Sequence, residues 1–316
     1  MAAGLLLLLV ALPTTAWGQS PVPSLIEQGR AAGADAELLR TVADRAEAAG
    51  FSDRATADLL RPAVSLAERD LPASPLLTKT LEGLAKQVPA GRMSPVLQRL
   101  QTHTQEAGAL VSSWVRQKGT QDLLGRSGPP PKAERDRLIT TIAQARQQDL
   151  PPAALEQFLT QLPGTVERRP VALSEVATAV SAMPDLPGAR DNPALARELL
   201  AAALNAGYDT ESLRQLPAAL EQARRTNSQP ATAIAKGAAR AIAQGTPAAN
   251  VLRTLFQGTV PGVGPAAGAG NGPPGTPPGQ GKPPGKEGRP PGAGAPDDPG
   301  NSPTDPPGGP PSGGGR

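Results

Sequence analysis

The sequence predicts an all-α protein built as an irregular helical repeat of helix–turn–helix hairpins, followed by a disordered Pro/Gly-rich tail. Aromatic residues make up 2% of the chain, so the core must come from Leu, Ala, Val and Ile. Ala and Leu favour helices, and runs of the residues that favour strands are missing. A turn pattern also recurs between apolar helical stretches. These observations together favour stacked helices over any sheet.

The turn pattern occurs six times. A helix-ending residue is followed by a mostly apolar residue and then by Ser, Asp or Pro. In five of the six cases another apolar residue stands five places after the first. The six junctions are Gly50-Phe51-Ser52, Asp70-Leu71-Pro72, Gln87-Val88-Pro89, Asp149-Leu150-Pro151, Gly207-Tyr208-Asp209 and Gly245-Thr246-Pro247.

This pattern has a physical reading as a helix stop followed by a helix start. Gly adopts the left-handed conformation of a helix C-terminus without steric cost. Ser, Asp or Pro then begins the next helix. The apolar residue before the cap is expected to contact the apolar residue at the fourth position of the next helix, as a hydrophobic staple. The best expected pairs are Leu71 with Leu76, Leu150 with Leu155, and Tyr208 with Leu213.

Spacing indicates a repeat. Two of the junctions, at Asp70 and Asp149, lie 79 residues apart, and those at Gly207 and Gly245 lie 38 apart. A helix pair of about 40 residues accounts for both intervals and is typical of helical solenoids. The alternative is an irregular bundle whose turns use the same local chemistry. Both readings give an all-α fold, solenoid-like in one case and a bundle in the other.

Composition divides the chain into five segments. Residues 1–18 read as a signal peptide, and 19–125 as an N-terminal helical lobe. Residues 126–131 contain three prolines, which remove backbone donors and fix φ, so they form a linker. Residues 132–258 form a C-terminal helical lobe. Residues 259–316 hold 17 Pro and 18 Gly and have too little apolar surface to offset the entropy of ordering.

Within the lobes, helical periodicity marks the expected core positions. Leu195, Leu199, Leu200 and Leu204 form one apolar stripe. A second stripe of apolar positions and one threonine lies in a longer helix expected to end near Lys118. Its members are Leu97, Leu100, Thr104 and Val111.

The N-terminus predicts export to the periplasm or secretion. Leu5 to Leu12 is an unbroken apolar run, too short to span a bilayer. Ala16 and Gly18 occupy positions −3 and −1 of a plausible cleavage site before Gln19. The basic residues usual before such a run are missing. The alternative reading is therefore a buried N-terminal helix.

Composition also limits the chemistry. The chain has no Cys and one His, His103, which is too few ligands for a typical zinc site even with Glu106 nearby. Asp185 and Asp191 flank a loop and are expected to cap helices, with cation binding as the alternative. The net charge of +3 comes from interspersed charges, which argues against a nucleic-acid interface. We therefore expect no catalytic residues, no cofactor and no metal.

Residues 70–89 read DLPASPLLTKTLEGLAKQVP. This segment resembles the pattern GLPxxPLLxKxxEGxAKxVP of uncharacterised exported Ala/Leu-rich helical proteins of high-GC bacteria. The resemblance covers about 20 residues. It implies an exported helical protein, and it assigns no activity and no site residues.

The function expected from these features is that of a non-catalytic scaffold or protein-interaction module of the bacterial cell envelope. Its partner would be another protein or an envelope component, and no transmembrane segment is expected after signal removal. A chaperone-like or membrane-surface binding protein is the alternative, and it would need an exposed apolar groove. An enzyme acting on envelope polymers is a third reading, which would need carboxylates converging in a cleft.

Overall fold

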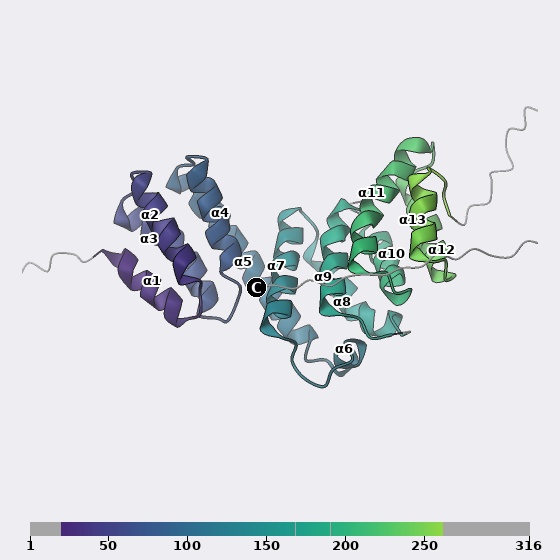
Figure 1. Ribbon diagram of the computed structural model, residues 1–316, viewed down its shortest axis with the longest axis horizontal. Helices are drawn as coiled ribbons and strands as arrows, with labels where there is room; N and C mark the ends of the chain where they lie inside the picture. Colours follow the sequence, from purple (N-terminus) through teal and green to yellow (C-terminus); the bar gives the residue numbers. More distant parts are fainter. Residues whose placement is uncertain (1–19, 168, 190, 262–316) are drawn as a thin grey trace, which may run out of the picture. The chain divides into compact units, whose positions relative to one another are not determined.

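The computed structural model describes residues 20–167, 169–189 and 191–261. Over these ranges the chain forms thirteen α-helices and one short 3₁₀ helix, with no strand (Figure 1). The all-α class predicted from composition is therefore confirmed. The predicted signal peptide lies outside the described residues, and so does the predicted tail from residue 262 onward.

The helices vary from 6 to 25 residues in length. Their bounds are α1 Pro21–Ala31, α2 Ala36–Ala48, α3 Asp53–Ala67, α4 Ser74–Ala85, α5 Ala90–Trp114, α6 Lys118–Leu123, α7 Lys132–Gln147, α8 Pro152–Thr165, α9 Leu173–Ala182, the 3₁₀ helix η1 Met183–Asp185, α10 Pro193–Asn205, α11 Thr210–Thr226, α12 Ala231–Ala243 and α13 Ala248–Phe256.

Packing follows the order of the helices along the chain. Each odd-numbered helix contacts the next odd-numbered helix, from α1 to α13. Among the even-numbered helices α2 contacts α4, and α6, α8, α10 and α12 contact one another in turn. Neighbouring helices in Figure 1 accordingly follow the colour order from purple to yellow-green. The described helices thus pack in two layers, while the regular repeat proposed above remains a prediction.

All six predicted junctions end a helix with a residue of positive φ. The values are 77° at Gly50, 56° at Asp70, 55° at Gln87, 65° at Asp149, 82° at Gly207 and 84° at Gly245. In each case the amide of the next residue donates a hydrogen bond to the carbonyl five residues earlier, as Tyr208 does to Ala203 at 3.0 Å. This is the Schellman motif, which satisfies carbonyls that would otherwise be left open at a helix end.

The helix starts follow the predicted chemistry at most junctions. The Ser52 hydroxyl accepts from the amide of Ala55, and the Asp209 carboxylate accepts from the amide of Ser212. Proline stands at the N-cap of the helices that begin at Ala90, Pro152 and Ala248. The start of α4 lies further along than Pro72 suggested. It begins at Ser74 because Ala73 is the N-cap and a second proline, at 75, occupies the first turn.

The long helix also ends earlier in the chain than predicted. Helix α5 ends at Trp114, and Lys118 begins the separate helix α6. Gln117 is extended, with φ −70° and ψ 134°, so the helical hydrogen bonding is interrupted there. Trp114 and Val115, which come just before this break, are both buried, and their side chains anchor the turn in the core.

The core consists mainly of the expected aliphatic residues. Both apolar stripes are buried, including every member of the group from Leu195 to Leu204. The three largest fully buried side chains are nevertheless aromatic, namely Trp114, Phe158 and Tyr208. Val260 is 5% exposed and packs against this core, although it belongs to the range predicted as tail.

The linker at 126–131 is free of helix, as predicted. Helices α5 and α7 pack against each other across it, and all the described helices belong to one compact unit. None of the helices in the described ranges combines the length and the apolar content needed to cross a bilayer.

Candidate functional site

His103 lies on α5 and is half-buried. Burial, followed by the positive charges of Arg146 and Arg99, lowers the pKa of His103 below its usual value of 6.5. Its Nδ1 atom is buried and has no hydrogen-bond partner among the described residues. Glu106 forms an ion pair with Arg146 of α7 instead of facing a shared ion with His103. The described residues contain no group of three side chains suited to holding a metal.

The two loop aspartates do not have the expected capping role. Asp185 ends the 3₁₀ helix η1, and Asp191 is exposed. Helix α10 is capped by the following residue, Asn192, whose side-chain oxygen accepts from the amide of Leu195 at 3.2 Å. Asn192 caps α10 rather than Asp191 because it directly precedes the helix. A capping side chain reaches only the amide of the second or third helical residue, and Asp191 is one residue further away.

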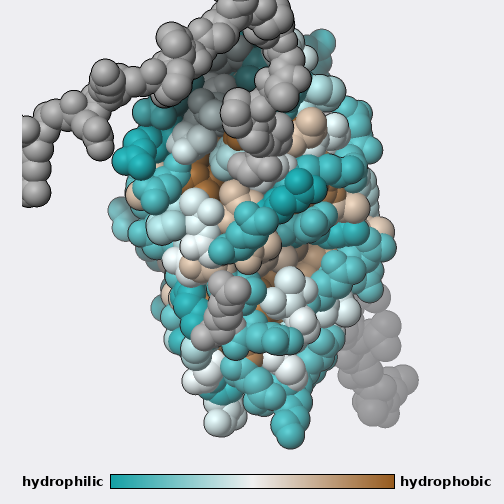
Figure 2. Space-filling model, turned by 90° about the vertical axis from the view of Figure 1, so that its right-hand side faces the viewer, coloured by the Kyte–Doolittle hydropathy of each residue, from teal (hydrophilic) through white to brown (hydrophobic). Residues whose placement is uncertain are grey.

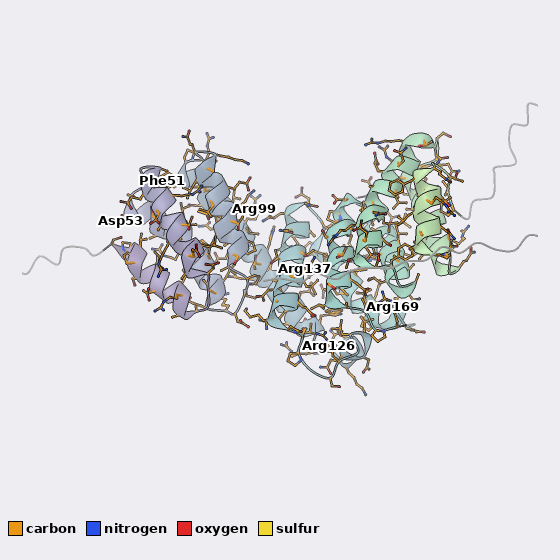
Figure 3. All side chains as sticks on the ribbon, viewed as in Figure 1. Phe51, Asp53, Arg99, Arg126, Arg137 and Arg169 are labelled. Atoms are coloured by element: carbon orange, nitrogen blue, oxygen red, sulfur yellow. The ribbon has the colours of Figure 1, made fainter. Side chains whose placement is uncertain are left out.

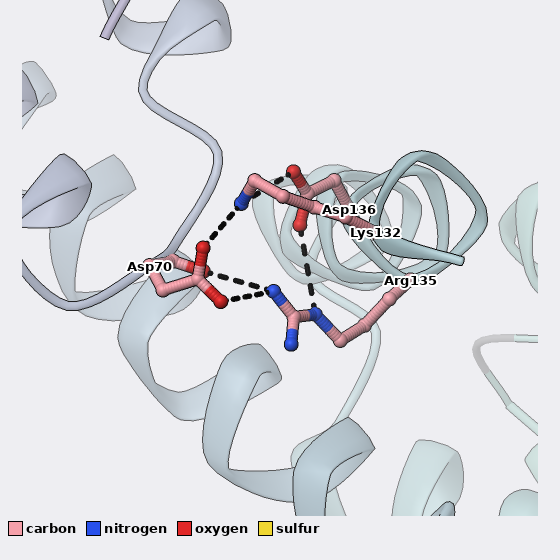
Figure 4. A network of polar contacts seen from close by, with 4 residues as sticks. All are labelled: Asp70, Lys132, Arg135 and Asp136. Carbon is pink, nitrogen blue, oxygen red and sulfur yellow. Dashed lines mark hydrogen bonds and ion pairs between the residues drawn. The ribbon is translucent and has the colours of Figure 1, made fainter. Parts of the chain in front are cut away.

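A network of four charged residues links the α3–α4 turn to the beginning of α7 (Figure 4). Asp70 accepts hydrogen bonds from Lys132, at 2.6 Å, and from Arg135. Lys132 also pairs with Asp136 at 3.1 Å. The hydrogen bonds from Lys132 and Arg135 lower the pKa of the Asp70 carboxyl below its ordinary 3.8. Two anions and two cations neutralise one another here, so the network is structural.

This network borders an open groove of about 610 Å³. The groove is formed by the α1–α2 turn, the α3–α4 turn and one side of α7. Asp35, another of its lining residues, caps α2 by accepting from the amides of Glu37 and Leu38. The carboxylates that line this groove are therefore already engaged within the protein. With Lys132 and Arg137 as its cations, the groove has three acidic and two basic side chains and no excess of positive charge.

A second groove of about 610 Å³ crosses the helices α8, α10 and α12, and it has a different character. We call it the α8–α10–α12 groove. Its floor includes the buried side chains of Phe158, Ala201 and Ala239, and its rim includes Arg197, Lys236 and Arg240. Figure 2 views the molecule from the side of α12 and α13, where hydrophobic residues lie between hydrophilic ones. The groove thus combines an apolar base with a polar edge.

Unpaired positive charge distinguishes this second groove. Lys236 and Arg240 are exposed, and neither takes part in the ion pairs found among the described residues. Arg197 is half-buried, and its Nη1 atom donates to Gln157 Oε1 at 2.5 Å, which holds the guanidinium against the wall. The acidic member of the lining is Glu198. Three basic side chains and one acidic side chain leave the groove positive.

Comparison with protein-family models, with curated proteins and with solved structures found no match. The assignment of a site therefore depends on the geometry of this chain alone.

Basic residues elsewhere are dispersed. Arg99, Arg126, Arg137 and Arg169 lie apart from one another on the ribbon (Figure 3). Among them, Arg126 pairs with Glu134 and Arg169 with Glu175. The α8–α10–α12 groove is the candidate functional site because two cations without an ion pair among the described residues, Lys236 and Arg240, lie on one helix at its apolar floor, whereas Arg99 and Arg137 stand singly. Sequence reasoning missed it, although Lys236 and Arg240 stand four residues apart, the spacing that places two side chains on one helix face.

Proposed function

We propose that this chain is a non-catalytic, exported protein-interaction module of the bacterial cell envelope, and that the α8–α10–α12 groove is its binding face. The observation that carries the proposal is the unpaired positive rim over an apolar floor. An apolar pocket with a few convergent polar groups is the usual form of a binding site. Successive packed helices supply such a surface without a catalytic centre.

The export part of the proposal rests on the sequence. The apolar run before Gln19 and the small residues at −3 and −1 support a signal peptide. The resemblance of residues 70–89 to exported helical proteins agrees with this reading. Fractionation of cells producing the full chain, with mass spectrometry of its mature N-terminus, tests export directly. Recovery of an uncleaved chain in the cytosolic fraction would refute it.

The interaction part is tested by site-specific photo-crosslinking in intact cells. A photoreactive residue is placed at Gln161 or Ala243, both exposed on the groove. The control position is Glu47, which is exposed on α2 and does not line the groove. We expect discrete protein adducts from the groove positions that the control position does not give. Adducts that are equal at all three positions would contradict the proposal, and so would adducts with lipid alone.

A further inference from the structure

We infer that the α8–α10–α12 groove binds an extended acidic segment of a partner protein, in which carboxylates on alternate residues pair with Lys236 and Arg240. This inference rests on the proposed function, because it names the chemistry of the partner. Its first support is charge. Lys236 and Arg240 form no ion pair among the described residues, whereas the groove beside Asp70 is lined by three carboxylates against two cations and has no excess of positive charge.

The spacing of the two cations supports an extended segment. Lys236 and Arg240 are four residues apart on α12, which is a rise of about 6 Å along the helix. Side chains on one face of an extended chain recur every second residue, at roughly 6.6 Å. Two carboxylates separated by one residue therefore match the two cations at the same time. Adjacent carboxylates point to opposite faces and do not match them.

The floor of the groove allows a main chain to approach closely. The side chains of Ala201 and Ala239 there are small, so the backbone of an extended segment can lie near the helices.

Arg197 completes the arrangement from the neighbouring helix. It lies on α10, which packs against α12, and its bond to Gln157 restricts the guanidinium to the wall. A pre-ordered arginine loses less conformational freedom when it binds an acceptor. We therefore assign Arg197 to a third carboxylate or to a main-chain carbonyl of the bound segment.

The test uses the full mature chain and fluorescently labelled peptides in an anisotropy titration. One peptide alternates Asp with Ala, and the second has the same composition in an Asp-Asp-Ala-Ala repeat, so that no two of its Asp residues are separated by just one residue. We expect the alternating peptide to bind at least about fivefold more tightly, and Lys236→Glu with Arg240→Glu to weaken it by at least about tenfold. Equal affinities for the two peptides, or an unchanged affinity of the double variant, would overturn the inference.

The controls separate this inference from the proposed function. Arg40→Glu with Arg54→Glu makes the same change of charge at exposed positions away from the groove, and it should leave peptide affinity within about twofold. Lys236→Arg should retain binding. Vesicles containing phosphatidylglycerol are the lipid probe, and groove-dependent binding to them in preference to the peptide would overturn the inference. Groove adducts with a partner that has no acidic segment would refute the inference and leave the interaction module intact.

Discussion

The indole Nε1 of Trp114 donates a hydrogen bond to the main-chain carbonyl of Leu159, at 2.7 Å. Pro163 stands four residues after Leu159 within α8 and has no amide hydrogen, so it cannot make the usual helical bond to that carbonyl. Trp114, which is 1% exposed, supplies the missing donor from α5. A proline inside one helix is thus compensated by an aromatic side chain of another, across the non-helical linker.

This relationship predicts a specific coupling. Trp114→Phe keeps most of the apolar volume but leaves the buried Leu159 carbonyl without its donor. We expect it to lower the free energy of unfolding by about 1–3 kcal/mol. In a Pro163→Ala background the new amide at 163 provides the helical donor, so the cost of Trp114→Phe should fall by about 1 kcal/mol. Urea unfolding of the four proteins, followed by circular dichroism, measures this double-mutant cycle.

Strict additivity of the two substitutions would show that the indole bond does not replace the helical one. Pro163 also lies against α6, since a Cβ on Gly119 would be 3.2 Å from the Pro163 Cβ atom. The double-mutant cycle removes the contribution of this contact. The effect of Trp114→Phe in the Pro163→Ala background is the difference between two proteins that both lack Pro163.

The local rules of the fold were readable from sequence, whereas this tertiary compensation was not. The junction at Gly207 was predictable because a helix stop, an apolar residue and a cap residue act within a few positions. The partner of Trp114 lies 45 residues away. No local pattern specifies which indole meets which carbonyl. For the same reason the composition indicated an aliphatic core but not that its three largest fully buried side chains are aromatic.

Asp70 and Asp149 form a matched pair for a second prediction. Both hold a left-handed conformation, with φ of 56° and 65°, and only Asp70 belongs to the charged network around Lys132. Asn tolerates this backbone region, so Asp→Asn removes charge with little conformational penalty. We expect Asp70→Asn to cost no more than about 1 kcal/mol at pH 7 and low salt, because the pairs are well exposed. Asp149→Asn should cost less.

The pH dependence of this difference has a definite sign. The folded-state pKa of Asp70 is lowered below 3.8, so its contribution to stability is present above that pH. It is lost as the pH falls through the lower folded-state value. Urea midpoints of wild type and Asp70→Asn should therefore converge in strong acid, and also in about 1 M salt, where exposed pairs are screened. A gap that persists in both conditions would argue against the charge network as its source.

Gly29 allows three helices to meet and gives a third prediction. It is buried on α1, and a Cβ built on it would lie 2.7 Å from Leu39 Cδ1 and 3.2 Å from Val64 Cγ2. We expect Gly29→Ala to destabilise the protein by about 1–3 kcal/mol through overpacking. Gly91→Ala is the matched control in a helix, since a Cβ there meets no atom within 4 Å. It should be neutral or stabilising, by up to about 1 kcal/mol.

Thermal unfolding of both glycine variants gives the ordering directly. A Gly29→Ala protein as stable as Gly91→Ala would mean that α1 shifts without cost and that its packing on α2 and α3 is loose.

The candidate site was less predictable than the fold. Lys236 and Arg240 share a helix face by simple spacing, which sequence alone reveals. Their lack of acidic partners depends on which surfaces α8 and α10 present, and that is set by helix packing. His103 and the loop aspartates attracted attention because their residue types carry chemistry. Among the described residues they belong to no group of three side chains that could hold a metal ion.

Tyr208 supplies the last prediction because it is the single tyrosine of the chain. It is 1% exposed, and its hydroxyl has no hydrogen-bond partner among the described residues. Burial raises the pKa of its hydroxyl above the ordinary 10.0. Tyr208→Phe removes a buried polar group that lacks compensation, so stability should stay unchanged or rise by about 1 kcal/mol. Because burial favours the neutral hydroxyl, the free energy of unfolding of the wild type falls as the pH rises above 10. The absorbance of tyrosinate should therefore be absent while the protein stays folded near pH 10. It should appear at higher pH, together with unfolding. Titration near pH 10 in the folded state, or a marked loss of stability in Tyr208→Phe, would show that the hydroxyl has a partner.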